Sequence, residues 1–148
     1  MGPGPLITDG VTELLVNIIE FTNIRQKILR QNINNMHTPG YVPQDLPIDE
    51  FSELLDEAVD EYIQDRQFLL CESSNVKFGG GPFDAAQGRL YVRPVPDRAA
   101  MSLLEEDQNR FLESQIDKLM ENSLNRRLAE ELLRRKAEKD LSLQATVN

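Results

Sequence analysis

The sequence predicts a mainly α-helical protein with a long helix at each end and a small middle region. Three observations support this fold class. Apolar residues recur at helical spacing over both ends of the chain, Pro and Gly cluster between residues 37 and 47, and an acidic amphipathic segment follows. We divide the 148 residues into an N-terminal helix and turn (1–43), a middle region (44–108) and a C-terminal helix (109–148).

The first helix is expected between Val11 and Met36, with Asp9 as its N-cap. Its apolar residues form one stripe and a second flank. The stripe comprises Val11, Leu14, Leu15, Ile18, Leu29, Ile33 and Met36, and the flank comprises Phe21, Ile24 and Ile28. The following residues, HTPGYVPQDLP at 37–47, contain three prolines and a glycine, which end the helix and begin an extended connector.

The last helix is expected from Asn109 to about Leu141, a stretch without Pro or Gly. Its apolar positions form two tracks, one of Leu112, Ile116 and Leu119 and one of Met120, Leu124, Leu128 and Leu132. A single narrow seam is typical of a two-stranded coiled coil, whereas two tracks indicate contact with more than one helix. The alternative is an ordinary monomeric bundle that uses both tracks internally, and composition alone favours it.

The middle region predicts one helix and two short strands. The helix begins near Pro47, whose fixed φ suits a first turn, and runs to about Leu69. Its apolar face comprises Phe51, Leu54, Leu55, Ala58 and Tyr62. Val76–Phe78 and Arg89–Arg93 are expected to be strands on either side of the loop GGGPFDAAQG.

The charge of the chain disfavours two classes of partner. The formal net charge is −9, with 25 acidic and 16 basic residues. Nucleic acids and anionic membrane surfaces attract basic proteins, so neither is an expected partner. No apolar run approaches the roughly 20 residues that span a bilayer, and the N-terminus lacks the basic n-region and the small-residue cleavage site of a secretory signal peptide. We therefore expect no direct membrane insertion.

The sequence offers no catalytic, metal-binding or cofactor-binding residues. The run Gly79–Pro82 lacks the GK[ST] of a phosphate loop, and the acids of residues 45–65 lack the order of a calcium loop. His37 has no second ligand at metal-binding spacing, and Cys71 is expected to be a buried or half-buried spectator thiol. A small enzyme that uses the acidic stretch ranks far behind the other functions considered below.

Residues 28–41, ILRQNINNMHTPGY, contain the most specific motif in the chain. They resemble the N-terminal motif of bacterial flagellar rod and hook axial proteins, in which a helix ends in N-I-A-N-x-x-T-P-G-Y. The matching residues are Asn32, Ile33, Asn35, Thr38, Pro39, Gly40 and Tyr41. The Asn side chains can cap backbone groups or bond to a neighbouring helix, and Gly40 allows a sharp reversal.

The C-terminal part of the chain resembles the same family. In NRFLESQIDKLMEN, residues 109–122, the matching positions are Asn109, Phe111, Glu113, Ile116, Leu119 and Asn122. Two residues depart from the family pattern, because Gln115 replaces an acid and Arg126 stands where an aromatic residue is common. Within the family, the stretch after TPGY and the short chain are most similar to the proximal rod proteins.

The resemblance implies a structural subunit of the periplasmic rod of the flagellar basal body, contributing to motility. It implies export through the flagellar type III apparatus without a cleaved signal peptide. The expected partners are other rod subunits and the membrane-embedded ring, with a monomer before assembly and an oligomer after it. The terminal helices would pair as a coiled-coil layer. The residues expected to pack there are Leu14, Leu15, Ile18, Leu29, Leu112, Ile116, Leu119, Asn122 and Leu124.

A second function fits the acidic charge and the small size as well. A soluble cytoplasmic adaptor, or a chaperone-like helical protein, would bind partner helices through its apolar stripes. The TPGY turn separates the two hypotheses, because an adaptor has no need for it.

Overall fold

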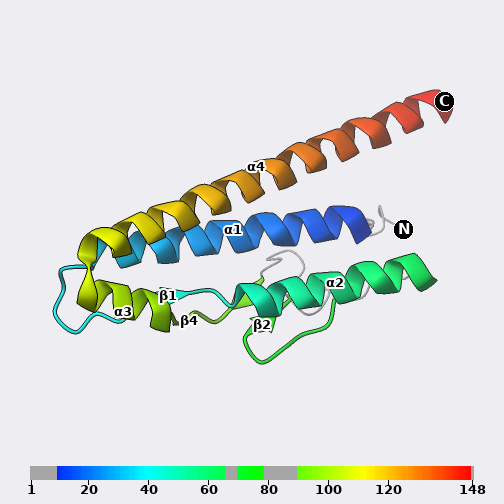
Figure 1. Cartoon of the computed structure of the whole chain (residues 1–148). Coiled ribbons are helices and arrows are strands. Elements are labelled where there is room, and N and C mark those ends of the chain that lie inside the picture. Colours follow the sequence, from blue (N-terminus) through cyan, green and yellow to red (C-terminus); the bar gives the residue numbers. More distant parts are fainter. Residues whose placement is uncertain (1–9, 66–69, 79–89, 148) are drawn as a thin grey trace.

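A computed structural model describes residues 10–65, 70–78 and 90–147 of the chain. This described part contains four helices and four two-residue strands, and the first and last helices pack together (Figure 1). The predicted mainly α fold is therefore confirmed. None of the helices in the described part is both long and apolar enough to cross a membrane.

The two terminal helices run in opposite directions along each other. Helix α1 spans Gly10–Asn34, and helix α4 spans Gln108–Val147 (Figure 1). At 1.5 Å per residue, the 40 residues of α4 extend for about 60 Å, against about 37 Å for the 25 residues of α1. The last part of α4 consequently continues past the start of α1 without a neighbouring helix in the described chain.

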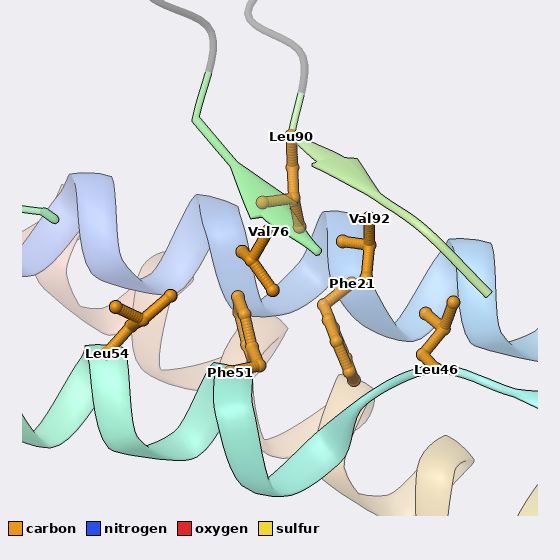
Figure 2. Packing of buried hydrophobic residues seen from close by; sticks show 7 residues of the cluster. All are labelled: Phe21, Leu46, Phe51, Leu54, Val76, Leu90 and Val92. Carbon is orange, nitrogen blue, oxygen red and sulfur yellow. The ribbon is translucent and has the colours of Figure 1, made fainter. Parts of the chain in front are cut away.

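Helix α2 and one pair of strands of the middle region pack against α1. Helix α2 spans Ile48–Asp65, and strands β2 (Val76–Lys77) and β3 (Tyr91–Val92) form an antiparallel pair. Figure 2 shows the core that joins these elements, comprising Phe21, Leu46, Phe51, Leu54, Val76, Leu90 and Val92. The rings of Phe21 and Phe51 stack with centroids 4.0 Å apart.

The sequence did not predict the elements between this core and α4. Strand β1 (Gln44–Asp45) pairs antiparallel with β4 (Val95–Pro96), and α3 (Arg98–Glu106) follows. Asp97 is the N-cap of α3, and its side chain accepts a hydrogen bond from the backbone of Ala100. This small unit brings the connector after α1 next to the start of α4.

Most predicted boundaries are close to the observed ones, and the end of the last helix is the exception. Helix α4 continues to Val147, beyond the expected end near Leu141. Cys71 is exposed, so the prediction of a buried or half-buried thiol is wrong. The predicted N-cap Asp9, the end of the acidic helix at residues 66–69 and the loop at residues 79–88 lie outside the described residues.

Candidate functional site: the joint between the terminal helices

The side chain of Asn32 joins α1 to the connector and to α4. Its amide nitrogen donates to the backbone oxygen of Gln44 at 2.7 Å and to Oε1 of Gln115 at 2.9 Å. Its amide oxygen accepts from the hydroxyl of Tyr41 at 2.8 Å and from the backbone N–H of Gln44 at 3.0 Å. These four bonds use the full hydrogen-bonding capacity of the amide, and the residue is completely buried.

The bond between Asn32 and Gln115 connects the two segments that carry the family resemblance. Of the two roles considered for the Asn side chains of the motif, capping a backbone group or bonding to a neighbouring helix, Asn32 shows the second through this bond. A second contact of this kind joins Asn122 to the backbone oxygen of Thr22 at 2.8 Å. The Nε2 of Gln115 is buried, and no described group accepts a hydrogen bond from it.

The TPGY residues form a tight turn that leads the chain away from α1. The backbone N–H of Tyr41 donates to the oxygen of Thr38 at 3.1 Å, and Gly40 has φ +74°. Proline at the second position and a positive-φ glycine at the third are typical of a type II turn. The Thr38 hydroxyl donates to Oδ1 of Asn35 at 3.2 Å, which ties the turn to the end of the helix.

Replacing Gly40 with valine is expected to lower the free energy of unfolding by about 1–2 kcal/mol, because a β-branched residue rarely adopts positive φ. An added Cβ would meet no atom within 4 Å, so the cost is backbone strain rather than a clash. Urea denaturation measures the change. Gly40→Asn is the matched control and should cost less, since Asn tolerates the left-handed region. Equal losses would contradict the assignment of strain.

A group of four charged residues lies beside Asn32. Arg25 makes two hydrogen bonds to the carboxylate of Asp45, at 2.9 and 3.0 Å, and both residues are buried. Lys118 on α4 lies 3.7 Å from Asp45 and 2.6 Å from Asp97. We call Asn32, Tyr41, Gln44, Gln115 and these four charged residues the terminal-helix joint.

The charged group was not predicted from the sequence. Arg25 interrupts the apolar stripe of the first helix, and Asp45 is one of many acids in the middle region. An arginine inside an apolar helix stripe was the available signal, because a buried cation needs a carboxylate partner. The partner itself could not be deduced from one sequence.

The charged group also lowers the pKa of Asp97. Burial raises the pKa of Asp97, but hydrogen bonds from Lys118 and Ala100 and the charge of Lys118 outweigh it, so the pKa lies below its usual value of 3.8. The pKa of Glu50 in α2 is also lowered, first by the hydrogen bond from Ser73 and then by Asn75.

The free energy of unfolding is therefore expected to fall as the solution becomes acidic. A lowered pKa in the folded state means that the ionised carboxylate stabilises the fold. This contribution is present above the unfolded pKa of Asp97 and is lost as the pH falls through the lower folded value, below about pH 4. Melting temperatures measured between about pH 7 and pH 2 test this. Asp97→Asn should weaken the dependence, and an unchanged slope in that variant would contradict the assignment.

The other predicted residues differ in burial. In the turn, Ile33, Asn35 and Tyr41 are half-buried, while Thr38, Pro39 and Gly40 are exposed. Among the predicted packing residues, Leu15, Leu29 and Asn122 are buried, Leu14, Ile18, Leu112 and Leu119 are half-buried, and Ile116 and Leu124 are exposed. The pairing of α1 and α4 thus uses only part of the predicted set, and the exposed members are available to another molecule.

The two departures from the C-terminal pattern of the family both bond to α1. Gln115 accepts the hydrogen bond from Asn32, and Arg126 donates to Oε1 of Gln26 at 2.8 Å.

In the described part of the chain, no group of three or more His, Cys, Asp or Glu side chains could hold a metal ion.

No known family model, curated protein or solved structure matches the chain.

Proposed function

We propose that the chain is a structural subunit of the proximal rod of the bacterial flagellum, most similar to the rod protein FlgB. One observation carries the proposal above the others. The two segments that resemble the axial-protein motifs are 83 positions apart at Asn32 and Gln115, yet they meet through a buried side-chain hydrogen bond. A turn that served only as a linker would not need such a connection.

The exposed apolar track of α4 supports assembly with other subunits. Met120, Leu124 and Leu128 follow one another at four-residue steps, and each is about 60% exposed. Exposed leucines in a continuous row are typical of a helix face that another chain covers. The proposed partners are other rod subunits and the membrane-embedded ring, reached after export through the flagellar type III apparatus. The proposed location is the periplasmic rod.

Leu124→Asp separates assembly from folding. Leu124 is 63% exposed in the single chain, so a charge there should leave the melting temperature nearly unchanged. In an assembled helix layer the same charge would be buried without a partner, which costs several kcal/mol. We expect a soluble, folded protein that does not restore swimming in soft agar to a strain lacking the gene.

The matched control is Ser102→Asp, which places the same charge on an exposed position of α3. It should restore swimming. Normal swimming with Leu124→Asp would contradict a role of this track in rod assembly.

The second candidate function is a soluble helical adaptor. An open apolar groove lined by Leu15, Ile18, Leu55 and Leu128 lies among α1, α2 and α4. This groove favours the adaptor, since such grooves receive partner helices. A strain lacking the gene would then assemble complete rods, which distinguishes the adaptor from the rod subunit.

A further inference from the structure

An open pocket of about 240 Å³ lies between α1 and α4, and we call it the Arg30 pocket. Gln26 and Arg30 of α1 line it together with Ile116, Met120, Ser123 and Arg126 of α4. Of the described residues that line the pocket, two are arginines and none is acidic. Because Ile116 and Met120 are also exposed, the pocket combines positive charge with open apolar surface.

The positive charge of the pocket is not neutralised within the described part of the chain. Arg30 is exposed, and none of the described carboxylates pairs with it. Arg126 lies 3.8 Å from the exposed Glu130, which is a weak surface pair. A carboxylate from another molecule would therefore meet charged hydrogen-bond donors without first breaking a buried ion pair.

Helix α2 has the complementary surface. It carries eight acidic residues, and it is the one described helix that has no basic residue. Val59 and Ile63 are exposed one helical turn apart. Asp56 lies about two turns before Ile63, on the same side of the helix, and Asp60 lies next to this side. An acidic helix with exposed apolar residues is complementary to a basic pocket with exposed apolar residues.

Helix α2 cannot enter the Arg30 pocket of its own chain. Phe51 of α2 stacks on Phe21 of α1, which fixes the side of α1 against which α2 packs (Figure 2). Phe21 and Arg30 are about two and a half helical turns apart, so they lie on opposite sides of α1. The helix that enters the pocket must therefore come from another molecule.

We propose that the Arg30 pocket binds helix α2 of a second copy of the chain. In this contact, the exposed apolar residues of α2 cover Ile116 and Met120, and Asp56 and Asp60 face Arg30 and Arg126. The contact is small, which is typical of weak association, so the chain is a monomer in dilute solution.

Pocket and α2 are different surfaces, so the contact is heterologous, and each added copy leaves one pocket and one α2 free. Repetition of the contact produces an open-ended assembly. The inference rests on the proposed function for its role in a rod, while the contact itself can be measured in solution without any rod.

Sedimentation velocity of the full-length chain, from about 10 μM to about 1 mM protein, measures the contact. We expect the average sedimentation coefficient of the natural chain to rise with concentration. The pocket variant, Arg30→Glu with Arg126→Glu, should weaken self-association by at least about tenfold. The α2 variant, Asp56→Lys with Asp60→Lys, should do the same, because each variant brings like charges together.

A mixture of the two variants is the decisive sample. The reversed pocket of one variant then meets the reversed α2 of the other, and the natural pocket meets the natural α2. Association of the mixture should return to within about threefold of that of the natural chain.

The matched control is Lys77→Glu with Arg93→Glu, which makes the same change in net charge at exposed positions in the middle region. It should associate like the natural chain. Circular dichroism checks the folding of each variant. Arg30→Gln gives a second readout, because it removes an exposed charge without a described partner and so leaves the fold intact, and it should weaken association by about threefold.

Three results would overturn the inference. The natural chain would remain a monomer at about 1 mM protein. The α2 variant alone would associate as strongly as the natural chain, which would assign the pocket to another segment. The mixture of the two variants would fail to associate.

This inference and the proposed function fail separately. Complete rods in a strain lacking the gene would remove the rod function and leave the measured contact in place. A natural chain that is required for rods but stays monomeric at high concentration would remove only this contact.

Discussion

Replacing Asn32 with leucine is expected to lower the free energy of unfolding by about 3–5 kcal/mol. Leucine keeps the size of the side chain but makes none of its four hydrogen bonds. Gln115, Tyr41 and the backbone of Gln44 then lose partners in a buried site, and each unsatisfied group costs about 1–3 kcal/mol. Because single domains are stable by only about 5–15 kcal/mol, this loss is a large fraction of the total stability.

The control for this prediction is Asn34→Leu. Asn34 belongs to the same helix end and is exposed, so its replacement should change the stability by less than about 0.5 kcal/mol. Chemical denaturation followed by circular dichroism measures both variants. Similar denaturation midpoints for the two would show that the bonds of Asn32 contribute little, and the proposed role of the joint would be wrong.

Asp45→Ala should have an effect of similar size for an electrostatic reason. Arg25 would keep its charge in a buried position after losing both hydrogen bonds from its guanidinium to the carboxylate. Breaking a buried ion pair on one side costs about 3–5 kcal/mol. The backbone N–H of Leu46 would also lose its bond to the carboxylate, 2.7 Å away. Thermal unfolding should show a lower melting temperature than for the exposed control Asp56→Ala.

A double variant tests the cause. Arg25→Met combined with Asp45→Leu removes both charges and keeps apolar volume in the site, which often restores stability. We expect the double variant to be more stable than Asp45→Ala alone. If it is equally unstable, the loss comes from packing or from the strand pair β1–β4, and the unpaired charge is not the cause.

Apolar spacing was sufficient to predict the three longer helices. The stripes of α1, α2 and α4 each repeat over several turns, and Pro39 and Pro47 mark where the chain changes direction. The strand pair β2–β3 was also predicted, from short β-branched and aromatic runs around a glycine-rich loop. Helix α4 ends later than expected because its last turns carry no stop signal such as Gly or Pro.

The remaining elements depend on contacts that one sequence does not reveal. Strands β1 and β4 have two residues each and pair over about 50 positions, so neither has a local pattern. Helix α3 has nine residues, too few for a clear apolar period. The pairing of Arg25 with Asp45 likewise depends on the path of the connector. Asn32 was predictable as a bonding residue, but its three partner residues, Tyr41, Gln44 and Gln115, were not.

The measurement that tests the rod proposal most directly is the isolation of basal bodies from a strain lacking this gene. Electron microscopy should show membrane rings without an attached rod, and the cells should not swim. Complementation with the natural sequence should restore rods that contain the protein, whereas Asn32→Leu should not. Complete rods and normal swimming in the deletion strain would contradict the proposal.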